Sequence, residues 1–260
     1  MSQDFEWHPT VLFRQTPDSQ PRAPFSLVIL NQPLRQNQAL GTLWENALVR
    51  IAADGGANRL FDLDGQNATR RYNNLDAIIG DLDSLLPNVR NHYAFQDEPA
   101  EIIHDSDQES TDFTKAVSWA RSKNGANVDI VALGGLGGRV DQGISQLHHL
   151  YLFQPGPRYE QGRVFLLSGQ SLTFLLKPGK HAIHVRDGGG GDVFAKHVGI
   201  VPLGEPSVIT THGLEWDVEN WETHLGGRIS TSNHVLPETK TVIVETTNQV
   251  IFTIALAGTE

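Results

Sequence analysis

The segment Asp76-Ala77-Ile78-Ile79-Gly80-Asp81-Leu82-Asp83-Ser84 joins a short apolar run to an acidic turn. Its apolar residues are continuous rather than alternating, which is typical of a strand buried on both faces of a parallel sheet. Asp81 and Asp83 follow that strand at its carboxyl end, which is the edge where open α/β sheets bind ligands. The segment therefore predicts an α/β fold with a polar site at this edge.

Four further runs of the same texture lie between Phe25 and about Phe153, at residues 25–30, 49–53, 101–103 and 128–133. Helical patterns lie between the runs. The pattern over 112–123 places Phe113, Val117 and Ala120 on one face. The last helical pattern likewise has apolar residues on one face, namely Val140, Ile144, Leu147 and Tyr151. Alternation of strands and helices predicts a doubly wound, Rossmann-like parallel sheet with helices on both faces.

The texture changes after about Gly162. Eight short β-rich runs follow, at residues 164–167, 172–176, 182–185, 198–203, 208–211, 228–232, 241–244 and 250–256. They predict a C-terminal β-sandwich or jelly roll. With a boundary at Gln154-Pro155-Gly156-Pro157, we expect an α/β domain over 25–155 and a β domain over 160–260. Residues 1–24 are expected to form an N-terminal arm, with one short strand near Val11, and Gly188–Gly191 a turn.

The composition narrows the function. The 260 residues carry a formal charge of −10 and contain no cysteine, which excludes disulfides and thiolate ligands. A net negative charge without a cluster of Lys and Arg residues argues against nucleic acid as a partner. No apolar run reaches the roughly 18 residues of a membrane span, and the polar N-terminus is unlike a signal peptide, so we expect no membrane association and a cytoplasmic protein.

Three more loops follow predicted strands. They are Asp54-Gly55-Gly56-Ala57-Asn58, the segment 108–115 with the sequence QESTDFTK, and Gly134-Gly135-Leu136-Gly137-Gly138-Arg139-Val140-Asp141. Each alone has a plain structural explanation, because a helix cap, a dipole-stabilising Asp or a glycine turn gives the same pattern. Taken alone, the Asp81-Leu82-Asp83 turn is better explained as a solvated surface turn than as a metal site. The glycine loop is neither a Walker A loop nor a dinucleotide fingerprint, but glycine amides and an Arg suit phosphate.

Together the four loops carry more weight than any one of them. They bring a set of carboxylates to one sheet edge, namely Asp54, Asp81, Asp83, Asp112 and Asp141. Close carboxylates repel one another, and a bound Mg²⁺ with nucleotide phosphates relieves that repulsion. The residues themselves therefore predict a Mg-nucleotide phosphotransferase or hydrolase.

In this order the four loops resemble those of thiamine pyrophosphokinases. The likeness continues in the β-rich half, in Gly213-Leu214-Glu215-Trp216-Asp217-Val218 and Ile229-Ser230-Thr231-Ser232-Asn233. Ile200-Val201-Pro202-Leu203-Gly204-Glu205 resembles the fungal members in particular. Two positions depart from the family pattern: Val140 stands where an aromatic residue is frequent, and Glu215 where Lys is common.

The resemblance implies pyrophosphate transfer from ATP to the hydroxyl of thiamine, with Mg²⁺, in a homodimer whose active sites lie at the subunit interface. It implies Mg²⁺ ligands, namely Asp81, Asp83 and Asp112. Asp54 and Arg139 join these three as catalytic residues, and Asp54 or Asp81 orients or deprotonates the hydroxyl. The implied ATP and phosphate contacts are Asn58, Gln108, Thr111, Lys115, Gly134, Gly135, Gly137, Gly138, Arg139 and Asp141.

The thiamine contacts implied in the β domain are Trp216, Ser230, Ser232 and Asn233. Taken without the resemblance, Trp216 is as well explained as ordinary sandwich core. Two other functions stay open at this point. One is a Mg-dependent pyrophosphoryl transferase that acts on another alcohol, and the other is a catalytically silent sensor of nucleotide or thiamine.

Overall fold

A computed structural model of the chain describes residues 3–14, 24–34, 38–65, 71–125, 127–186 and 192–258. The chain forms two compact units, one made of residues 20–169 and the other of residues 1–19 together with 170–260. We call them the α/β unit and the β unit and describe each by itself. The Gly188–Gly191 turn predicted from the sequence lies outside the described residues.

Six parallel strands form the sheet of the α/β unit, in the order β7-β6-β2-β3-β4-β5. Their bounds are β2 Phe25–Ile29, β3 Val49–Ala53, β4 Ala77–Gly80, β5 Glu101–His104, β6 Asp129–Leu133 and β7 Val164–Leu167. All residues of β2, β4 and β7 are buried, as their continuous apolar sequences predict. The predicted parallel sheet is confirmed.

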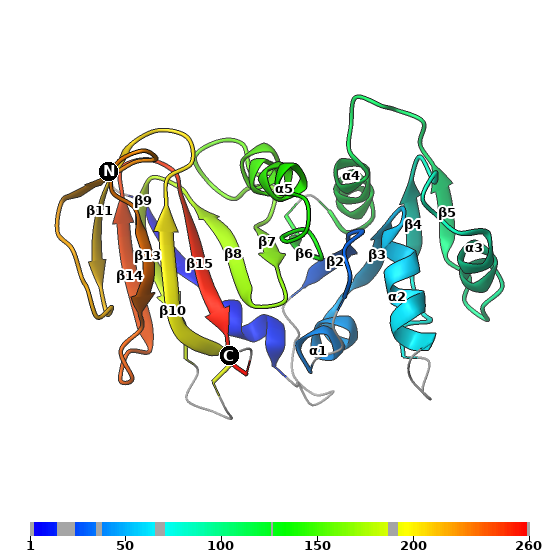
Figure 1. Cartoon of the computed structure of the whole chain (residues 1–260), viewed down its shortest axis with the longest axis horizontal. Helices are drawn as coiled ribbons and strands as arrows, with labels where there is room; N and C mark the ends of the chain where they lie inside the picture. Colours follow the sequence, from blue (N-terminus) through cyan, green and yellow to red (C-terminus); the bar gives the residue numbers. More distant parts are fainter. Residues whose placement is uncertain are drawn as a thin grey trace. The chain divides into compact units, whose positions relative to one another are not determined.

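Five helices connect these strands: α1 Gln38–Asn46, α2 Gly56–Gly65, α3 Pro87–Ala94, α4 Asp112–Asn124 and α5 Val140–Leu152. Parallel connections are right-handed, so the steps from β2 out to β5 place α1 to α3 on one face. The steps back to β6 and on to β7 place α4 and α5 on the other face. Figure 1 shows α4 and α5 on one side of the strands and α1 and α2 on the other, which confirms helices on both faces.

The direction of strand addition reverses between β2 and β6, which are neighbours in the sheet. Such a reversal opens a crevice at the carboxyl ends of the two strands, where α/β proteins bind ligands. The loops after β2 and β6 begin at Leu30 and Gly134, so the glycine loop lies at this switch point. The acidic loops follow the neighbouring strands β3, β4 and β5 at the same edge.

Two details of the α/β unit differ from the sequence predictions. Residues 164–167 were assigned to the β-rich half, but they form β7, which extends the parallel sheet beside β6. A short apolar run does not reveal its pairing partner, since pairing depends on contacts far apart in sequence. The apolar set on α5 is not uniformly buried either, because Val140 is 76 % exposed and Ile144 63 % exposed.

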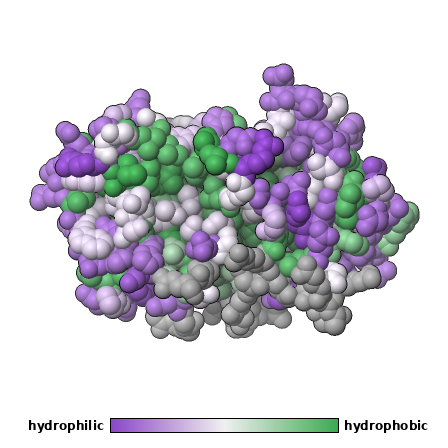
Figure 2. Space-filling view, viewed as in Figure 1, coloured by the Kyte–Doolittle hydropathy of each residue, from purple (hydrophilic) through white to green (hydrophobic). Residues whose placement is uncertain are grey.

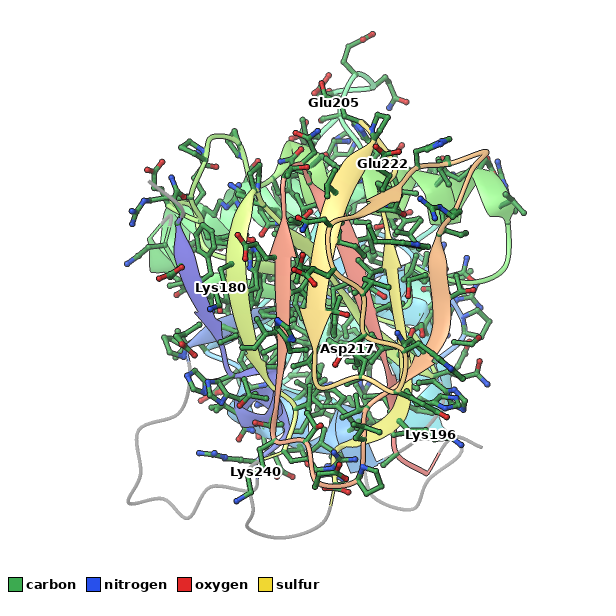
Figure 3. All side chains as sticks on the ribbon, turned by 90° about the vertical axis from the view of Figure 1, so that its left-hand side faces the viewer. Lys180, Lys196, Glu205, Asp217, Glu222 and Lys240 are labelled. Atoms are coloured by element: carbon green, nitrogen blue, oxygen red, sulfur yellow. The ribbon has the colours of Figure 1, made fainter. Side chains whose placement is uncertain are left out.

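The β unit contains two sheets, ordered β1-β9-β14-β11-β12 and β13-β10-β15-β8. The first is built from β1 Asp4–Trp7, β9 Gly179–His184, β11 Ser207–His212, β12 Trp221–Thr223 and β14 Thr241–Thr246. The second is built from β8 Ser171–Leu176, β10 Phe194–Val201, β13 Ser230–His234 and β15 Val250–Leu256. All pairings are antiparallel except that of β1 with β9. Figure 3 shows the first sheet facing the viewer, and the predicted β-sandwich is confirmed.

Aromatic side chains fill the core between the two sheets. Trp7 on β1 stacks on Phe174 on β8 at a ring separation of 4.6 Å, and Phe174 contacts Phe252 on β15. The N-terminal segment thus contributes a strand and a core residue to the β unit. The predicted strand near Val11 is wrong, since Pro9–Phe13 forms a 3₁₀ helix that Pro9 starts and the strand is Asp4–Trp7. No helix in the described residues is long and apolar enough to cross a membrane.

Candidate active site

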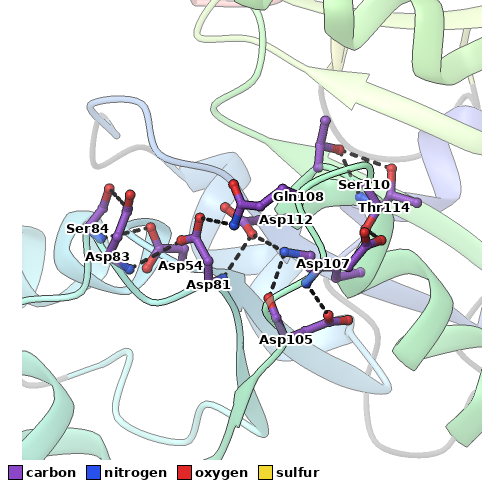
Figure 4. Close-up of polar contacts among 12 residues, drawn as sticks. Asp54, Asp81, Asp83, Ser84, Asp105, Asp107, Gln108, Ser110, Asp112 and Thr114 are labelled. Carbon is purple, nitrogen blue, oxygen red and sulfur yellow. Dashed lines mark hydrogen bonds and ion pairs between the residues drawn. The ribbon is translucent and has the colours of Figure 1, made fainter.

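Three carboxylates meet at the carboxyl edge of the parallel sheet. Asp54 follows β3, while Asp81 and Asp83 follow β4, and each offers an oxygen within 4.8 Å of the others. Figure 4 shows Asp54 between Asp83 and Asp81. We call these three residues the acidic triad. Three carboxylates this close favour a cation among them, because their mutual repulsion is otherwise uncompensated.

Asp54 is the buried member of the acidic triad, with 4 % of its surface exposed and a positive φ of 42°. Its Oδ2 accepts a hydrogen bond from the amide of Ser84 at 3.2 Å. Its Oδ1 is buried and has no hydrogen-bond partner within the described residues. Burial raises the pKa of Asp54, and the charge of Asp112 adds to the rise. A buried carboxylate oxygen without a donor is a position that a metal ion satisfies.

The turn after β4 orients the other two members of the acidic triad, Asp81 and Asp83. Leu82 adopts a positive φ of 60°, and the amide of Asp83 donates to Oδ1 of Asp81 at 3.2 Å. That backbone hydrogen bond lowers the pKa of Asp81, so this carboxylate is ionised at neutral pH. Ser84 Oγ donates to Oδ1 of Asp83 at 2.8 Å, and Gln108 Nε2 lies 3.5 Å from Oδ2 of Asp81. The predicted contact residue Gln108 therefore borders the acidic triad.

Asp112 stands beside the acidic triad rather than within it. It is the first residue of α4, and its Oδ1 accepts from the amide of Asp81 at 3.3 Å. Burial raises the pKa of Asp112, and the nearby charge of Asp81 raises it further. A side chain at Gly80 would come within 2.8 Å of both Asp112 Oδ1 and the Asp54 Cβ, so only glycine fits between them. Asp54, and not Asp112, completes the group of three with Asp81 and Asp83.

The ammonium of Lys115 is turned inward. Its side chain is 3 % exposed, and Nζ donates to the Asp105 carbonyl at 2.8 Å and lies 3.4 Å from Asp112 Oδ1. Lys115 therefore compensates the charge of Asp112 from beneath the site. The direct phosphate contact that the sequence suggests for Lys115 stays a prediction, and in the structure its ammonium contacts Asp112.

Asn58 has a comparable supporting role. Its Nδ2 donates to the Ser84 carbonyl at 2.7 Å, and its Oδ1 accepts from the amide of Leu86 at 3.1 Å. Both ends of the amide thus hold the loop that carries Asp81 and Asp83. The phosphate contact that the sequence suggests for Asn58 stays a prediction, and in the structure its polar atoms hold the acidic loop from the side of α2.

The glycine loop after β6 packs closely against the loop after β2. Gly134, Gly137 and Gly138 have positive φ values of 79°, 130° and 68°. A side chain at Gly138 would come within 2.8 Å of Gln32 Oε1, and one at Gly135 within 2.8 Å of Gln146 Cγ. The close contacts and the positive φ values explain why glycine occupies these positions at the switch point.

Arg139 and Asp141 lie at the start of α5 and pair with each other. Arg139 Nε lies 3.1 Å from Oδ1 of Asp141, and Nη2 lies 2.5 Å from Oδ2. The guanidinium lowers the pKa of Asp141 through these hydrogen bonds. The two side chains are 73 % and 59 % exposed, and ion pairs this exposed contribute little to stability. Arg139 can therefore exchange this partner for a phosphate at little cost.

Thr111 caps α4 and is held by a histidine that the sequence did not single out. Its Oγ1 accepts from the amide of Thr114 at 3.2 Å and lies 3.0 Å from Nε2 of His149 on α5. Nδ1 of His149 lies 2.5 Å from the Ser145 carbonyl, so Nδ1 carries the proton and Nε2 accepts. Burial lowers the pKa of His149, which keeps the ring neutral. His149 thus fixes the cap that precedes Asp112.

The predicted thiamine contacts lie in the β unit and differ in exposure. Trp216 is 55 % exposed, so its indole offers a ring face to a ligand and is not core. Ser230 and Ser232 lie on β13, partly exposed and exposed respectively, and Ser232 has a positive φ of 57°. Asn233 is only 4 % exposed.

Asn233 holds the main chain of Trp216. Its Oδ1 accepts from the amide of Trp216 at 3.1 Å and from the amide of His234 at 2.8 Å, and its Nδ2 donates to the Trp216 carbonyl at 2.9 Å. With its amide fully engaged, Asn233 acts as a clamp on Trp216. The His234 ring lies 5.1 Å from the indole, and its Nδ1 lies 2.5 Å from Oε2 of Glu215.

Sequence reasoning missed two polar residues at the switch point, Asn31 and Gln32. Oδ1 of Asn31 accepts from Nε of Arg59 at 2.9 Å, and Gln32 packs on Gly134 and Gly138. The available signal was their position, because Asn31-Gln32-Pro33 follows the buried β2 directly. Polar residues after a buried parallel strand belong to the ligand-binding edge. His149 and His234 gave no such signal, because a histidine pattern does not reveal which long-range partner it meets.

Comparisons with known proteins agree with this arrangement. Residues 40–160 match the family described as thiamin pyrophosphokinase, catalytic domain, and residues 180–251 match its vitamin B1 binding domain. Thiamine pyrophosphokinase 3 of rice is 38 % identical over 249 residues, which cover 90 % of this chain and 88 % of the relative. Thiamine pyrophosphokinase of Saccharomyces cerevisiae is 28 % identical over 89 % of this chain and 85 % of its own.

Solved structures give the same result. Yeast thiamin pyrophosphokinase matches with a TM-score of 0.83 and 26 % identity, covering 97 % of this chain and 91 % of its own. The enzyme from Candida albicans matches with a TM-score of 0.78 and 26 % identity, covering 97 % and 93 %. With both halves matched and the fold reproduced, this chain belongs to the thiamin pyrophosphokinase family.

Proposed function

We propose that this chain transfers pyrophosphate from ATP to the hydroxyl of thiamine, giving AMP and thiamine diphosphate. Family membership supports the activity. The single structural observation that carries the proposal is the acidic triad, Asp54, Asp81 and Asp83, at the carboxyl edge of the sheet. It lies at the same edge as the glycine loop of the switch point. A cation site and a phosphate site side by side suit a Mg-nucleotide.

The acidic triad fits Mg²⁺ by its chemistry. All its donors are carboxylate oxygens, which hard Mg²⁺ prefers, and Asp54 Oδ1 is buried without a partner in the described part of the chain. We propose that Asp54, Asp81 and Asp83 hold the ion and that Asp112 supports them. Bound there, Mg²⁺ supplies positive charge that offsets the negative charge of the transferring group.

The chain's own groups position the nucleotide. The amides of Gly134 to Gly138 and the guanidinium of Arg139 are proposed to bind ATP phosphates, with Asp141 releasing Arg139 when phosphate arrives. Phosphoryl transfer depends mainly on such positioning and on charge neutralisation. Asp54 and Asp81 both remain candidates to orient the attacking hydroxyl.

Thiamine is proposed to bind on the exposed indole of Trp216. A cationic thiazolium over an aromatic ring gains ~0.5–2 kcal/mol. Glu215 adds a carboxylate next to the ring, bound to His234. Ser230 and Ser232 are the hydroxyls available on β13 for polar contacts, and Asn233 fixes the main chain of Trp216.

We also propose that the protein is a homodimer with its active sites at the subunit interface. Exposed apolar residues on α5 support it, since Val140, Ile144 and Leu152 are each at least half exposed. Figure 2 shows apolar surface near the position that α5 has in Figure 1. Several exposed apolar residues on one helix are typical of a protein contact. The cytoplasmic location stays a prediction from the sequence.

Product analysis tests the activity. The protein is incubated with ATP, Mg²⁺ and thiamine, and the nucleotides and thiamine esters are separated. We expect AMP and thiamine diphosphate in equal amounts. ADP with thiamine monophosphate would contradict pyrophosphoryl transfer. ATP turnover that ignores thiamine but responds to another alcohol would favour the alternative transferase, and binding without turnover would favour a sensor.

A further inference from the structure

We propose that Glu6, His8 and His184 form a second metal site, which binds a divalent transition-metal ion such as Zn²⁺ on the β unit. Each of the three side chains offers a ligand atom within 4.8 Å of the other two. The set contains two imidazoles and one carboxylate, in contrast to the all-carboxylate acidic triad. The proposal is independent of the catalytic function.

Strand pairing explains why the three residues meet. β1 runs parallel to β9 in a register that places Glu6 opposite Ala182 and Trp7 opposite Ile183. Successive side chains of a strand point to opposite faces. Trp7 points into the core, so Glu6 and His8 point outward, and His184 ends β9 beside His8. Figure 3 shows β1 at the sheet edge next to β9, and Glu6 and His8 are exposed while His184 is partly exposed.

His184 is already oriented as a metal ligand would be. Its Nε2 lies 2.6 Å from Oε2 of Glu6, and its Nδ1 lies 3.0 Å from Oγ1 of Thr241 on β14. Metal-binding histidines use one ring nitrogen for the metal and fix the other with a hydrogen bond. Thr241 supplies that second contact, which leaves Nε2 of His184 facing the carboxylate and the proposed ion.

His8 completes the site by turning its ring. In the metal-free structure the rings of His8 and His184 stack at 4.3 Å with an angle of 3° between their planes. The lone pair of an imidazole nitrogen lies in the ring plane, so two parallel rings cannot both point at one ion. His8 lies beyond the end of β1 and is exposed, so its ring can leave the stack without disturbing the core.

The ligand set selects the metal. Imidazole nitrogens favour Zn²⁺ and similar ions, whereas Mg²⁺ favours oxygen. Two histidines, one glutamate and a water match the tetrahedral shell of an open zinc site. Bound there, the ion would fasten the N-terminal strand, which pairs only with β9 among the described strands, to the rest of the sheet. Its effect is to stabilise the edge of the β unit.

Titration with Co²⁺ alone, as a coloured substitute for Zn²⁺, tests the site. Excess Mg²⁺ is present to compete at the acidic triad, and the chain contains no cysteine to add thiolate bands. We expect one Co²⁺ per chain with the visible absorption of a tetrahedral site. Glu6→Gln and His8→Ala should each weaken binding about tenfold or more, and Thr241→Val about 10- to 100-fold. His224→Ala, an exposed histidine elsewhere on the β unit, is the matched control and should bind like the wild type.

The absence of tetrahedral absorption in the wild-type protein would overturn the proposal. So would His8→Ala and Glu6→Gln titrations that superimpose on that of His224→Ala. Glu6 and His8 are exposed, and Glu6→Gln preserves side-chain shape, so both variants should fold. At the same Zn²⁺ concentration, the melting temperature should rise equally in the wild type and in His224→Ala, and less in His8→Ala.

Discussion

The amide of Ser84 donates to Oδ2 of Asp54 at 3.2 Å, while Oδ1 of the same carboxylate is buried with no partner in the described residues. One oxygen thus fixes the acidic loop and the other is left for a cation. The protein keeps a charge at this position that its own fold does not fully compensate. Such a residue favours ligand binding at the expense of stability.

Asp54→Asn should raise stability and lower activity. Burial raises the pKa of Asp54 in the folded chain above its ordinary value of 3.8. The carboxyl group therefore gives its full contribution to stability only below about pH 3.8. That contribution is lost as the pH rises through the pKa of Asp54 in the folded chain. At neutral pH and without Mg²⁺, urea unfolding should show the variant at least as stable as the wild type, with a gain on the order of 1 kcal/mol. Turnover should fall by about 100-fold or more. A clear loss of stability with normal turnover would make Asp54 purely structural.

His149 should make stability fall as the solution becomes acidic. Burial lowers the pKa of His149 below its ordinary 6.5, so the unfolded chain takes up this proton first as pH falls. The stability contribution is complete above about pH 6.5 and is lost as pH drops from there toward the folded value. Urea unfolding at pH 7.5 and pH 5.5 should show a smaller pH dependence in His149→Gln than in the wild type. The exposed neighbour His148→Gln is the control, and equal slopes in both variants would refute the role of His149.

Asn233 should act on thiamine binding through Trp216. Asn233→Ala removes two hydrogen bonds to the main chain of Trp216, each with a net contribution of ~1 kcal/mol. We expect the KM for thiamine to rise about tenfold, the KM for ATP to stay unchanged, and the intrinsic fluorescence of Trp216 to shift. Trp216→Ala alone, with Asn233 unchanged, should also raise the KM for thiamine. An Asn233→Ala enzyme with wild-type KM and fluorescence would show that the clamp is dispensable.

Ile144 should govern subunit association. It is 63 % exposed in the single chain, and a charge there opposes burial in a contact between copies. Light scattering should give twice the chain mass for the wild type and a single chain mass for Ile144→Glu. Phe95→Glu changes an apolar residue that is 83 % exposed on another part of the α/β unit, and it should stay dimeric. A monomeric wild type, or a dimeric Ile144→Glu, would place the contact elsewhere or remove it.

The sequence predicted the architecture because local patterns determine it. The continuous apolar residues of β2 and β4 indicated buried parallel strands, and the polar loops after them indicated the binding edge. Pairing is a long-range property, so the run at 164–167 indicated a strand but not that this strand pairs in parallel with β6. The N-terminal strand was missed for the same reason, because Asp4–Trp7 becomes a strand only beside β9.

The candidate site shows the same limit at the level of single side chains. The sequence brought the acidic loops together but could not tell which carboxylate is buried, and the structure groups Asp54 with Asp81 and Asp83. Lys115 and Asn233 are polar residues inside functional motifs, which made direct ligand contacts the natural prediction. Both residues are buried, Lys115 contacts Asp112 and Asn233 holds the main chain of Trp216, while their direct ligand contacts stay predictions.

The acidic triad is proposed to hold the metal for thiamine pyrophosphorylation, and Asp83→Asn removes one of its three carboxylates. Asp83 is exposed, so its removal should not unfold the chain, and Asp62→Asn on α2 is a matched exposed control. The measurement is thiamine-dependent AMP formation as a function of Mg²⁺ concentration. We predict that Asp83→Asn loses turnover by orders of magnitude and requires more Mg²⁺, while Asp62→Asn follows the wild type. An Asp83→Asn curve that coincides with that of Asp62→Asn would contradict the account.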